Sequence, residues 1–106
     1  MRIAILTSTE TRHRYFVNAI RGRFDVVAVG YEQTGYDPAD TADFGLTVEE
    51  DRIVAAHFAD RSSQEQRFFG HNDARAQSDG SCSVYDIAPG VLNSPETLGW
   101  LERARA

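Results

Sequence analysis

The sequence predicts an α/β fold that forms one half of a doubly wound parallel sheet, with its elements in the order β-α-β-α-β-α. Two short apolar runs rich in β-branched residues stand at 2–7 and 25–32, with a helical stripe of apolar side chains between them. A strand, a helix and a strand within about 30 residues form a βαβ unit, and such units make parallel sheets. A third short strand and a last helix follow, so residues 1–106 are predicted to be one domain portion with an incomplete sheet.

The run at 2–7 is short and apolar, and we expect a strand buried on both faces. Thr9 or Thr11 is placed to cap the following helix, and Gly22 to end it. Gly30, inside the second strand, would let a neighbouring group approach closely. The apolar stripe of the helix consists of Phe16, Val17, Ile20 and Phe24.

The middle of the chain is predicted to contain a mobile loop over 33–48 and helical structure over 49–70. Ser62-x-x-Glu65 is a capping-box pattern, which indicates either two helices or one helix with a kink. A second polar loop is expected over 71–81.

The last third of the chain is predicted to hold a strand over 83–88 and a final helix. Ser94 precedes a proline and a glutamate, which is the pattern of an N-cap, a first helical position and an acid in the first turn.

Composition excludes some classes of partner. The net charge is −5, so bulk attraction to nucleic acid is not expected. Residues 1–31 carry five arginines and two acids, a net charge of +3, whereas residues 32–51 carry seven acids and no basic residue, a net charge of −7. No run reaches the length of a membrane span. Cys82 is the single cysteine, which precludes an internal disulfide and predicts a reducing, cytoplasmic compartment.

The turn after the first strand is the first candidate site. Ligands of open α/β sheets bind beyond the carboxyl ends of the strands, and amides at a helix start attract anions. Thr7, Ser8 and Thr9 supply hydroxyls, Arg12 supplies positive charge, and Glu10 would repel phosphate. The turn lacks G-x-G-x-x-G, so it does not predict a dinucleotide site. A plain helix cap is the alternative interpretation.

A second candidate lies in the helical region. His57 and Arg61 are four residues apart, as are Arg61 and Glu65, which could form an ion pair on one face. An amphipathic helix that covers the sheet explains this pattern, and so does a helix that places His57 or Arg61 at the rim of a substrate pocket.

The other polar clusters do not predict a functional site. His71, Asn72 and Asp73 are adjacent, and neighbours in a loop rarely point at one atom, so we expect a solvent-exposed turn. The three histidines lack the spacing of a zinc site.

Four segments occur together in a familiar order: RIAILTSTETRHRYFVNAI, FDVVAVGYE, AHFADRSSQEQRFFG and PGVLNSPETLGWL. In this order they resemble the N-terminal part of the formyltransferase family, which includes methionyl-tRNA formyltransferase, glycinamide ribonucleotide formyltransferase and the sugar N-formyltransferases. The resemblance covers nearly the whole chain. Its specific parts are H-F-A-x-R…E-x-x-F-F and G-x-x-N-S-P-E.

The resemblance implies a Rossmann-like domain that transfers a formyl group from 10-formyltetrahydrofolate to an amine, an amino sugar being one candidate. The family's catalytic Asn, His and Asp follow its fourth and later strands, and no residue of this chain matches them. Only the loop from Thr7 to Glu10 matches a family site, the loop after the first strand. The resemblance implies that this loop lies beside the amine substrate. We therefore expect a fragment that is inactive alone and that can self-associate through the unpaired edge of its first strand.

Two alternative functions of other classes stay open. One is a non-catalytic half-Rossmann module that binds a nucleotide or a partner protein. The weaker one is a phosphate-binding receiver domain, which would need acids at the strand ends; Glu32 is available, but no pair of aspartates follows the first strand.

Overall fold

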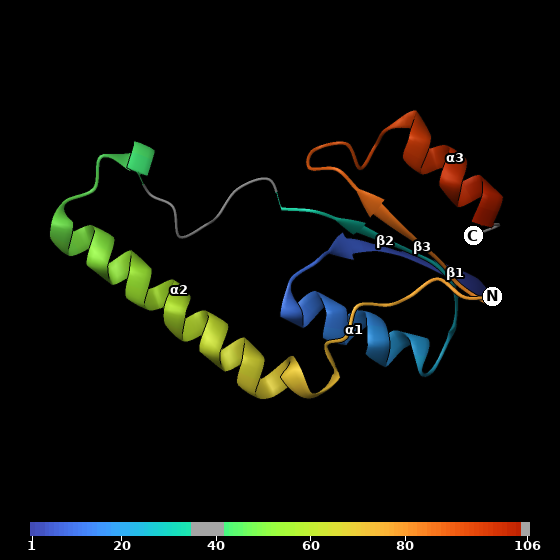
Figure 1. The fold of residues 1–106 in the computed structure, drawn as a ribbon, viewed down its shortest axis with the longest axis horizontal. Helices are drawn as coiled ribbons and strands as arrows, with labels where there is room; N and C mark the ends of the chain where they lie inside the picture. Colours follow the sequence, from blue (N-terminus) through green and yellow to red (C-terminus); the bar gives the residue numbers. More distant parts are fainter. Residues whose placement is uncertain (35–41, 105–106) are drawn as a thin grey trace.

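The computed structural model describes residues 1–34 and 42–104. Residues 35–41 of the predicted 33–48 loop lie outside this part of the chain. The alternation of strands and helices confirms the predicted α/β class (Figure 1). The elements are β1 (Arg2–Ser8), α1 (Thr11–Arg21), β2 (Asp25–Glu32), the 3-10 turn η1 (Ala42–Phe44), α2 (Val48–Phe69), the 3-10 turn η2 (Gly70–Asn72), β3 (Ser83–Ile87) and α3 (Pro95–Ala104).

The three strands form one parallel sheet in the order β1-β2-β3. Val29 at the centre of β2 is in register with Ile5 of β1 on one side and with Val84 of β3 on the other. Helix α1 lies on one face of the sheet and α3 on the opposite face (Figure 1). This arrangement matches one half of a doubly wound sheet.

The core lies between β2 and α1. Val17 of α1 and Val29 and Tyr31 of β2 are completely buried, and Ile5 of β1 joins them. The Tyr31 hydroxyl accepts a hydrogen bond from the backbone N–H of Ala76, 3.1 Å away, which anchors the 71–81 loop to the sheet. The interior of β2 is an unbroken apolar run because the strand has another strand on each side and a helix over each face.

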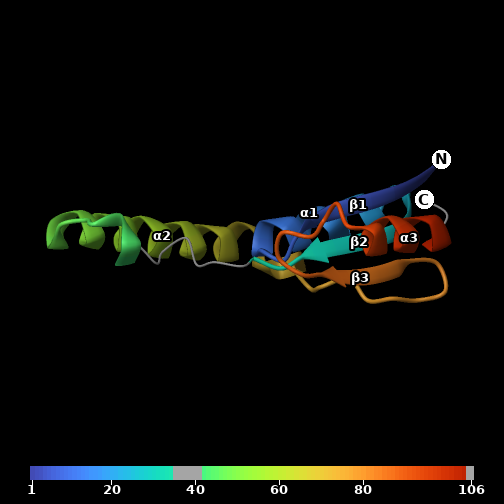
Figure 2. The same cartoon turned by 90° about the horizontal axis from the view of Figure 1, so that it is seen from above.

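The prediction that the first strand is buried on both faces is wrong. Leu6 of β1 is 41% exposed. The reason is positional: β1 has a neighbour on one side only, and α3 packs against β2 and β3 rather than over β1. Figure 2 shows β1 as the outer strand.

Two predicted helix boundaries also need correction. Helix α1 has Glu10 at its N-cap, and no side chain caps it, so neither Thr9 nor Thr11 has the predicted role. The capping box of α2 is formed by Thr47 and Glu50 rather than by the Ser62–Glu65 pattern, which lies inside one continuous helix.

In that capping box, the Thr47 hydroxyl accepts from the Glu50 N–H at 3.1 Å, and the Glu50 carboxylate accepts from the Thr47 N–H at 3.0 Å. The hydrogen bond from the Thr47 backbone N–H, and after it the Thr47 side chain, stabilises the charged carboxylate and lowers the pKa of Glu50. Two other predicted boundaries are confirmed. Gly22 ends α1, and the Ser94 hydroxyl accepts from the Thr97 N–H at the start of α3.

The amphipathic interpretation required α2 to cover the sheet. In the structure, α2 does not cover it. None of its 22 residues is buried. It packs on α1 and η2 through its C-terminal half, while its N-terminal half projects beyond the sheet in both views (Figures 1 and 2). Among the described residues, no helix is both long enough and apolar enough to cross a membrane.

The tightest packing around β2 makes a first prediction. A Cβ added at Gly30 would stand 2.8 Å from Cδ2 of Leu6, 2.9 Å from Cδ1 of Ile87 and 3.2 Å from Cζ3 of Trp100. We expect Gly30→Ala to destabilise the fold by about 1–3 kcal/mol through overpacking. Urea unfolding would measure the loss. Gly80→Ala is the control, because nothing lies within 4 Å of its added Cβ, and an equal effect of the two substitutions would contradict the assignment.

Candidate functional site

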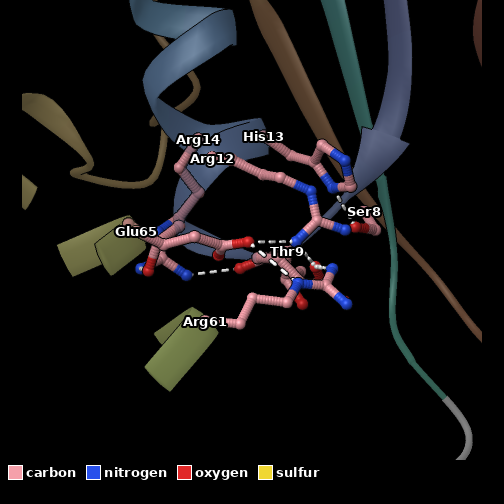
Figure 3. Close-up of polar contacts among 9 residues, drawn as sticks. Ser8, Thr9, Arg12, His13, Arg14, Arg61 and Glu65 are labelled. Carbon is pink, nitrogen blue, oxygen red and sulfur yellow. Dashed lines mark hydrogen bonds and ion pairs between the residues drawn. The ribbon is translucent and has the colours of Figure 1, made fainter. Parts of the chain in front are cut away.

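Polar side chains gather where β1 ends and α1 begins. The Ser8 hydroxyl and Nδ1 of His13 share a hydrogen bond (Figure 3). Partial burial of the imidazole, reinforced by the Arg12 charge, lowers the pKa of His13 below 6.5. The ring is therefore neutral at about pH 7 and can both donate and accept a hydrogen bond.

Two arginines and two glutamates form a closed ionic network beside this pair. Nη1 of Arg12 contacts the Glu10 carboxylate and lies 2.5 Å from Oε1 of Glu65. Arg61 reaches the same two carboxylates, with Nε 3.3 Å from Glu65 and Nη2 3.7 Å from Glu10. Each guanidinium thus bridges both acids, and the network is electrically balanced (Figure 3). It joins α1 to α2 across 53 positions of sequence.

A second set of contacts on α1 fixes the end of α2. Arg14 donates to the backbone carbonyl of Thr9, and its Nε and Nη2 lie 2.6 and 3.1 Å from the carbonyl and carboxylate oxygens of Asp73. The Asn18 amide donates to the carbonyls of Asn72 and Ala74, at 3.0 and 2.9 Å. These bonds hold the η2 turn, and with it the C-terminal end of α2, against α1.

The ionic network borders a cleft of about 650 Å³ between α1 and α2. Its apolar wall is formed by Ala55, Phe58 and Ala59 of α2. The Arg61 guanidinium lies 5.9 Å from the centroid of the Phe58 ring. The polar lining comes from both helices and consists of Glu10, Thr11, Arg12, Arg14, Arg61, Ser62, Glu65 and Gln66.

The structure brings together most of the site residues predicted from sequence. Glu10, Arg12 and Arg61 line the cleft. Ser8 and Thr9 do not line it, but they bond to His13 and Arg14 at its border.

Two predicted site residues lie elsewhere. Thr7 belongs to β1, in register with Tyr31, and does not line the cleft. His57 is exposed on α2, where its ring meets Phe58 edge-on at 5.2 Å, and it does not line the cleft either.

The polar cluster after α2 forms the expected turn. His71 and Asn72 are exposed, and the Asp73 carboxylate pairs with Arg14, so the three side chains do not converge. Within the described residues, no group of three His, Cys, Asp or Glu side chains could hold a metal ion.

Sequence reasoning missed the roles of Phe58, Gln66 and His13 in this region. The pairing of Arg61 with Glu65 was visible from their spacing and is confirmed. The link from Arg12 to Glu65 left no sequence signal, because it joins segments that meet only in the folded chain. The Ser8–His13 bond spans a strand end, a turn and a helix start, which no simple periodicity connects.

This arrangement suits binding better than catalysis. Its balanced charges offer guanidinium donors and carboxylate acceptors to a polar ligand, with one aromatic ring beside them. In the described part of the chain, no carboxylate bonds to His13 to extend the Ser8–His13 pair into a triad.

Comparisons with known proteins find no matching family model, no matching curated protein and no matching solved structure. The resemblance to the formyltransferases therefore stays a prediction from the sequence.

The shared carboxylate of Glu65 generates a second prediction. Glu65→Ala leaves Arg12 and Arg61 with one acid between them, and we expect a loss of about 1–3 kcal/mol in the free energy of unfolding. Hydrogen exchange should rise along the C-terminal half of α2. Glu49→Ala is the control, since that side chain is 75% exposed and lies 3.9 Å from Arg52 alone. Unchanged exchange in Glu65→Ala would show that the network does not hold α2.

The lowered pKa of His13 generates a third prediction. The unfolded chain binds this proton more readily than the folded chain, so the stability due to neutral His13 is complete above 6.5 and is lost as the pH falls through the lower folded-state pKa. His13→Asn keeps an uncharged partner for Ser8, and it should lose less stability than the unmodified chain between about pH 7 and pH 5. An NMR titration midpoint of His13 at or above 6.5 would contradict this assignment.

Proposed function

We propose that this chain forms the amine-binding wall of a formyltransferase-type domain. One observation carries the proposal: the two segments most involved in the resemblance meet at one cleft. Glu10, Thr11 and Arg12 come from the segment RIAILTSTETRHRYFVNAI, and Phe58 and Arg61 come from the H-F-A-x-R run. These segments lie far apart in sequence, so their meeting at a polar cleft supports a shared binding role.

The position of the cleft also supports the proposal. It opens beside the carboxyl end of β1, where open α/β sheets bind their ligands. The outer side of β1 has no neighbouring strand among the described residues. In the proposed enzyme, a fourth strand lies beside β1 and the catalytic Asn, His and Asp follow this and later strands, so the present chain contributes binding without those groups.

The proposed chemistry assigns a binding role to each type of side chain. Formyl transfer needs an uncharged amine, whose nitrogen attacks the formyl carbon while the bond to the donor nitrogen breaks and a proton moves to that leaving nitrogen. Glu10 and Glu65 can accept hydrogen bonds from the amine and hydroxyl groups of the acceptor. Arg12 and Arg61 can donate to its oxygens, and Phe58 can cover an apolar face of a sugar ring.

The lining of this cleft favours the acceptor over the formyl donor. 10-Formyltetrahydrofolate carries flat pterin and benzoyl rings, whereas the apolar lining consists of Phe58 and two alanines. We therefore place the donor across the open edge of β1, outside the described residues, and we expect no donor binding by this chain alone.

A non-catalytic binding module is the second candidate. Its nucleotide-binding form is disfavoured, because the Glu10 carboxylate stands at the start of α1, where a phosphate would bind. Its partner-binding form is compatible with the closed ionic network, which can hold α2 in place without any ligand.

The fourth prediction tests amine binding at the cleft directly. In a ¹⁵N-labelled sample, D-glucosamine should shift the amide signals of residues 9–12 and 61–66, and N-acetyl-D-glucosamine should shift them less, because its amine is blocked. Glu65→Ala should weaken the response, and Glu49→Ala should not. 5-Formyltetrahydrofolate, a stable analogue of the donor, should leave the spectrum unchanged.

Two results would overturn the proposal. Equal responses to the free and the acetylated sugar, or no response to either, would remove the amine-binding role. Formyl transfer from 10-formyltetrahydrofolate by the chain alone would show that the catalytic groups lie within it.

A further inference from the structure

The Ser8–His13 pair is the strongest feature that the proposed function does not use. Ser8 is the last residue of β1 and His13 lies in the first turn of α1. The Ser8 hydroxyl and Nδ1 of the neutral imidazole share a hydrogen bond (Figure 3). Both residues are partly exposed, so a small molecule can reach them from solvent. A hydroxyl bonded to a neutral imidazole is the arrangement in which a histidine activates a serine nucleophile.

The start of α1 is open beside this pair. Hydroxyl residues precede the helix, yet no side chain caps it. The Glu10 carbonyl accepts from the N–H groups of His13 and Arg14, whereas the N–H groups of Thr11 and Arg12 have no acceptor in the described part of the chain. Free N–H groups at a helix start stabilise negative charge. One strand, turn and helix start therefore present a nucleophile, a base and hydrogen-bond donors for an oxyanion.

We propose that Ser8 is the nucleophile of an acyl-transfer site for small carboxylic esters, with His13 as its general base. The proposal rests on contacts within residues 8–14 and does not depend on the proposed function. The neighbouring cleft supplies groups that bind a ligand, whereas this pair supplies groups that form and break a bond.

The proposed step balances without a cofactor. Ser8 Oγ attacks the carbonyl carbon of the ester while its proton moves to Nδ1 of His13, and the free N–H groups at the start of α1 donate to the oxyanion. The bond from the carbonyl carbon to the alcohol oxygen then breaks, and His13 gives the proton to that oxygen. Water next attacks the acyl group on Ser8 by the same route, which releases a carboxylic acid and restores the hydroxyl.

Esters are the expected substrates for a chemical reason. No carboxylate bonds to His13 in the described part of the chain, so Ser8 is activated less than the serine of a Ser-His-Asp triad. An ester has a better leaving group than an amide and needs less activation. The formyl donor of the proposed enzyme is an amide, so this activity is separate from formyl transfer.

Covalent labelling tests the nucleophile. Phenylmethanesulfonyl fluoride should sulfonylate Ser8, with a new Oγ–S bond and release of fluoride and the hydroxyl proton, and peptide mass spectrometry should locate the label. We expect Ser8 to react about 100-fold faster than Ser63, an exposed serine of α2, which is the lower end of the effect of a general base. This measurement uses the unmodified chain and does not depend on whether a variant folds.

Ester hydrolysis tests the base. The unmodified chain should release 4-nitrophenolate from 4-nitrophenyl acetate faster than buffer does, and it should carry an acetyl group on Ser8. Ser8→Ala should remove this activity, and His13→Asn should slow it about 100-fold. Ser63→Ala and His57→Asn are the matched controls, because both residues are exposed on α2 and neither lines the cleft. Circular dichroism verifies that each variant is folded.

Three outcomes would overturn the proposal. They are equal labelling of Ser8 and Ser63, ester hydrolysis that Ser8→Ala leaves unchanged, and an equal loss in His13→Asn and His57→Asn, which would indicate hydrolysis by any imidazole. Selective labelling of Ser8 together with a selective loss in His13→Asn supports it, whatever the sugar titration shows.

Discussion

The central position of β2 is the constraint on which the rest of the structure depends. Its apolar run has a strand on each side and a helix over each face, so the core forms around Val29 and Tyr31. With three strands, a central β2 leaves β1 and β3 as the two edges. The open edge of β1, the partial exposure of Leu6 and the position of the loop after Ser8 all follow from this one arrangement.

Helix α2 is held by a different kind of force. In proteins, most helical stability comes from packing an amphipathic face against the rest of the fold, yet no residue of α2 is buried. Polar contacts replace that burial: the network of Arg12, Arg61, Glu10 and Glu65, and the bonds from Arg14 and Asn18 to the η2 turn. The cleft exists because these contacts hold α2 beside the start of α1 rather than over the sheet.

The same polar contacts are the reason for which we propose a binding role for this site. Its arginines and glutamates neutralise one another, so the cleft offers directional hydrogen bonds rather than a net charge. This suits the proposed acceptor, which carries both amine and hydroxyl groups. In the proposed reaction, the groups that the resemblance implies for proton transfer would follow further strands beyond β1.

The sequence by itself determined the local structure. Apolar runs with β-branched residues indicated the three strands, and Ser94 marked the start of α3, because each of these signals depends on neighbours a few residues apart. The period of α1 placed Val17 inward, but Phe16 and Phe24 of the same predicted stripe are 55% and 56% exposed. The sequence also indicated the Arg61–Glu65 pair and, as site residues, Glu10, Arg12 and Arg61 among those that line the cleft. Only the tertiary structure decided which face of β1 stays partly exposed and where α2 lies. It also decided that Arg12 contacts Glu65. These depend on contacts between segments more than fifty residues apart, and no local pattern records which distant surface will be available when the chain folds.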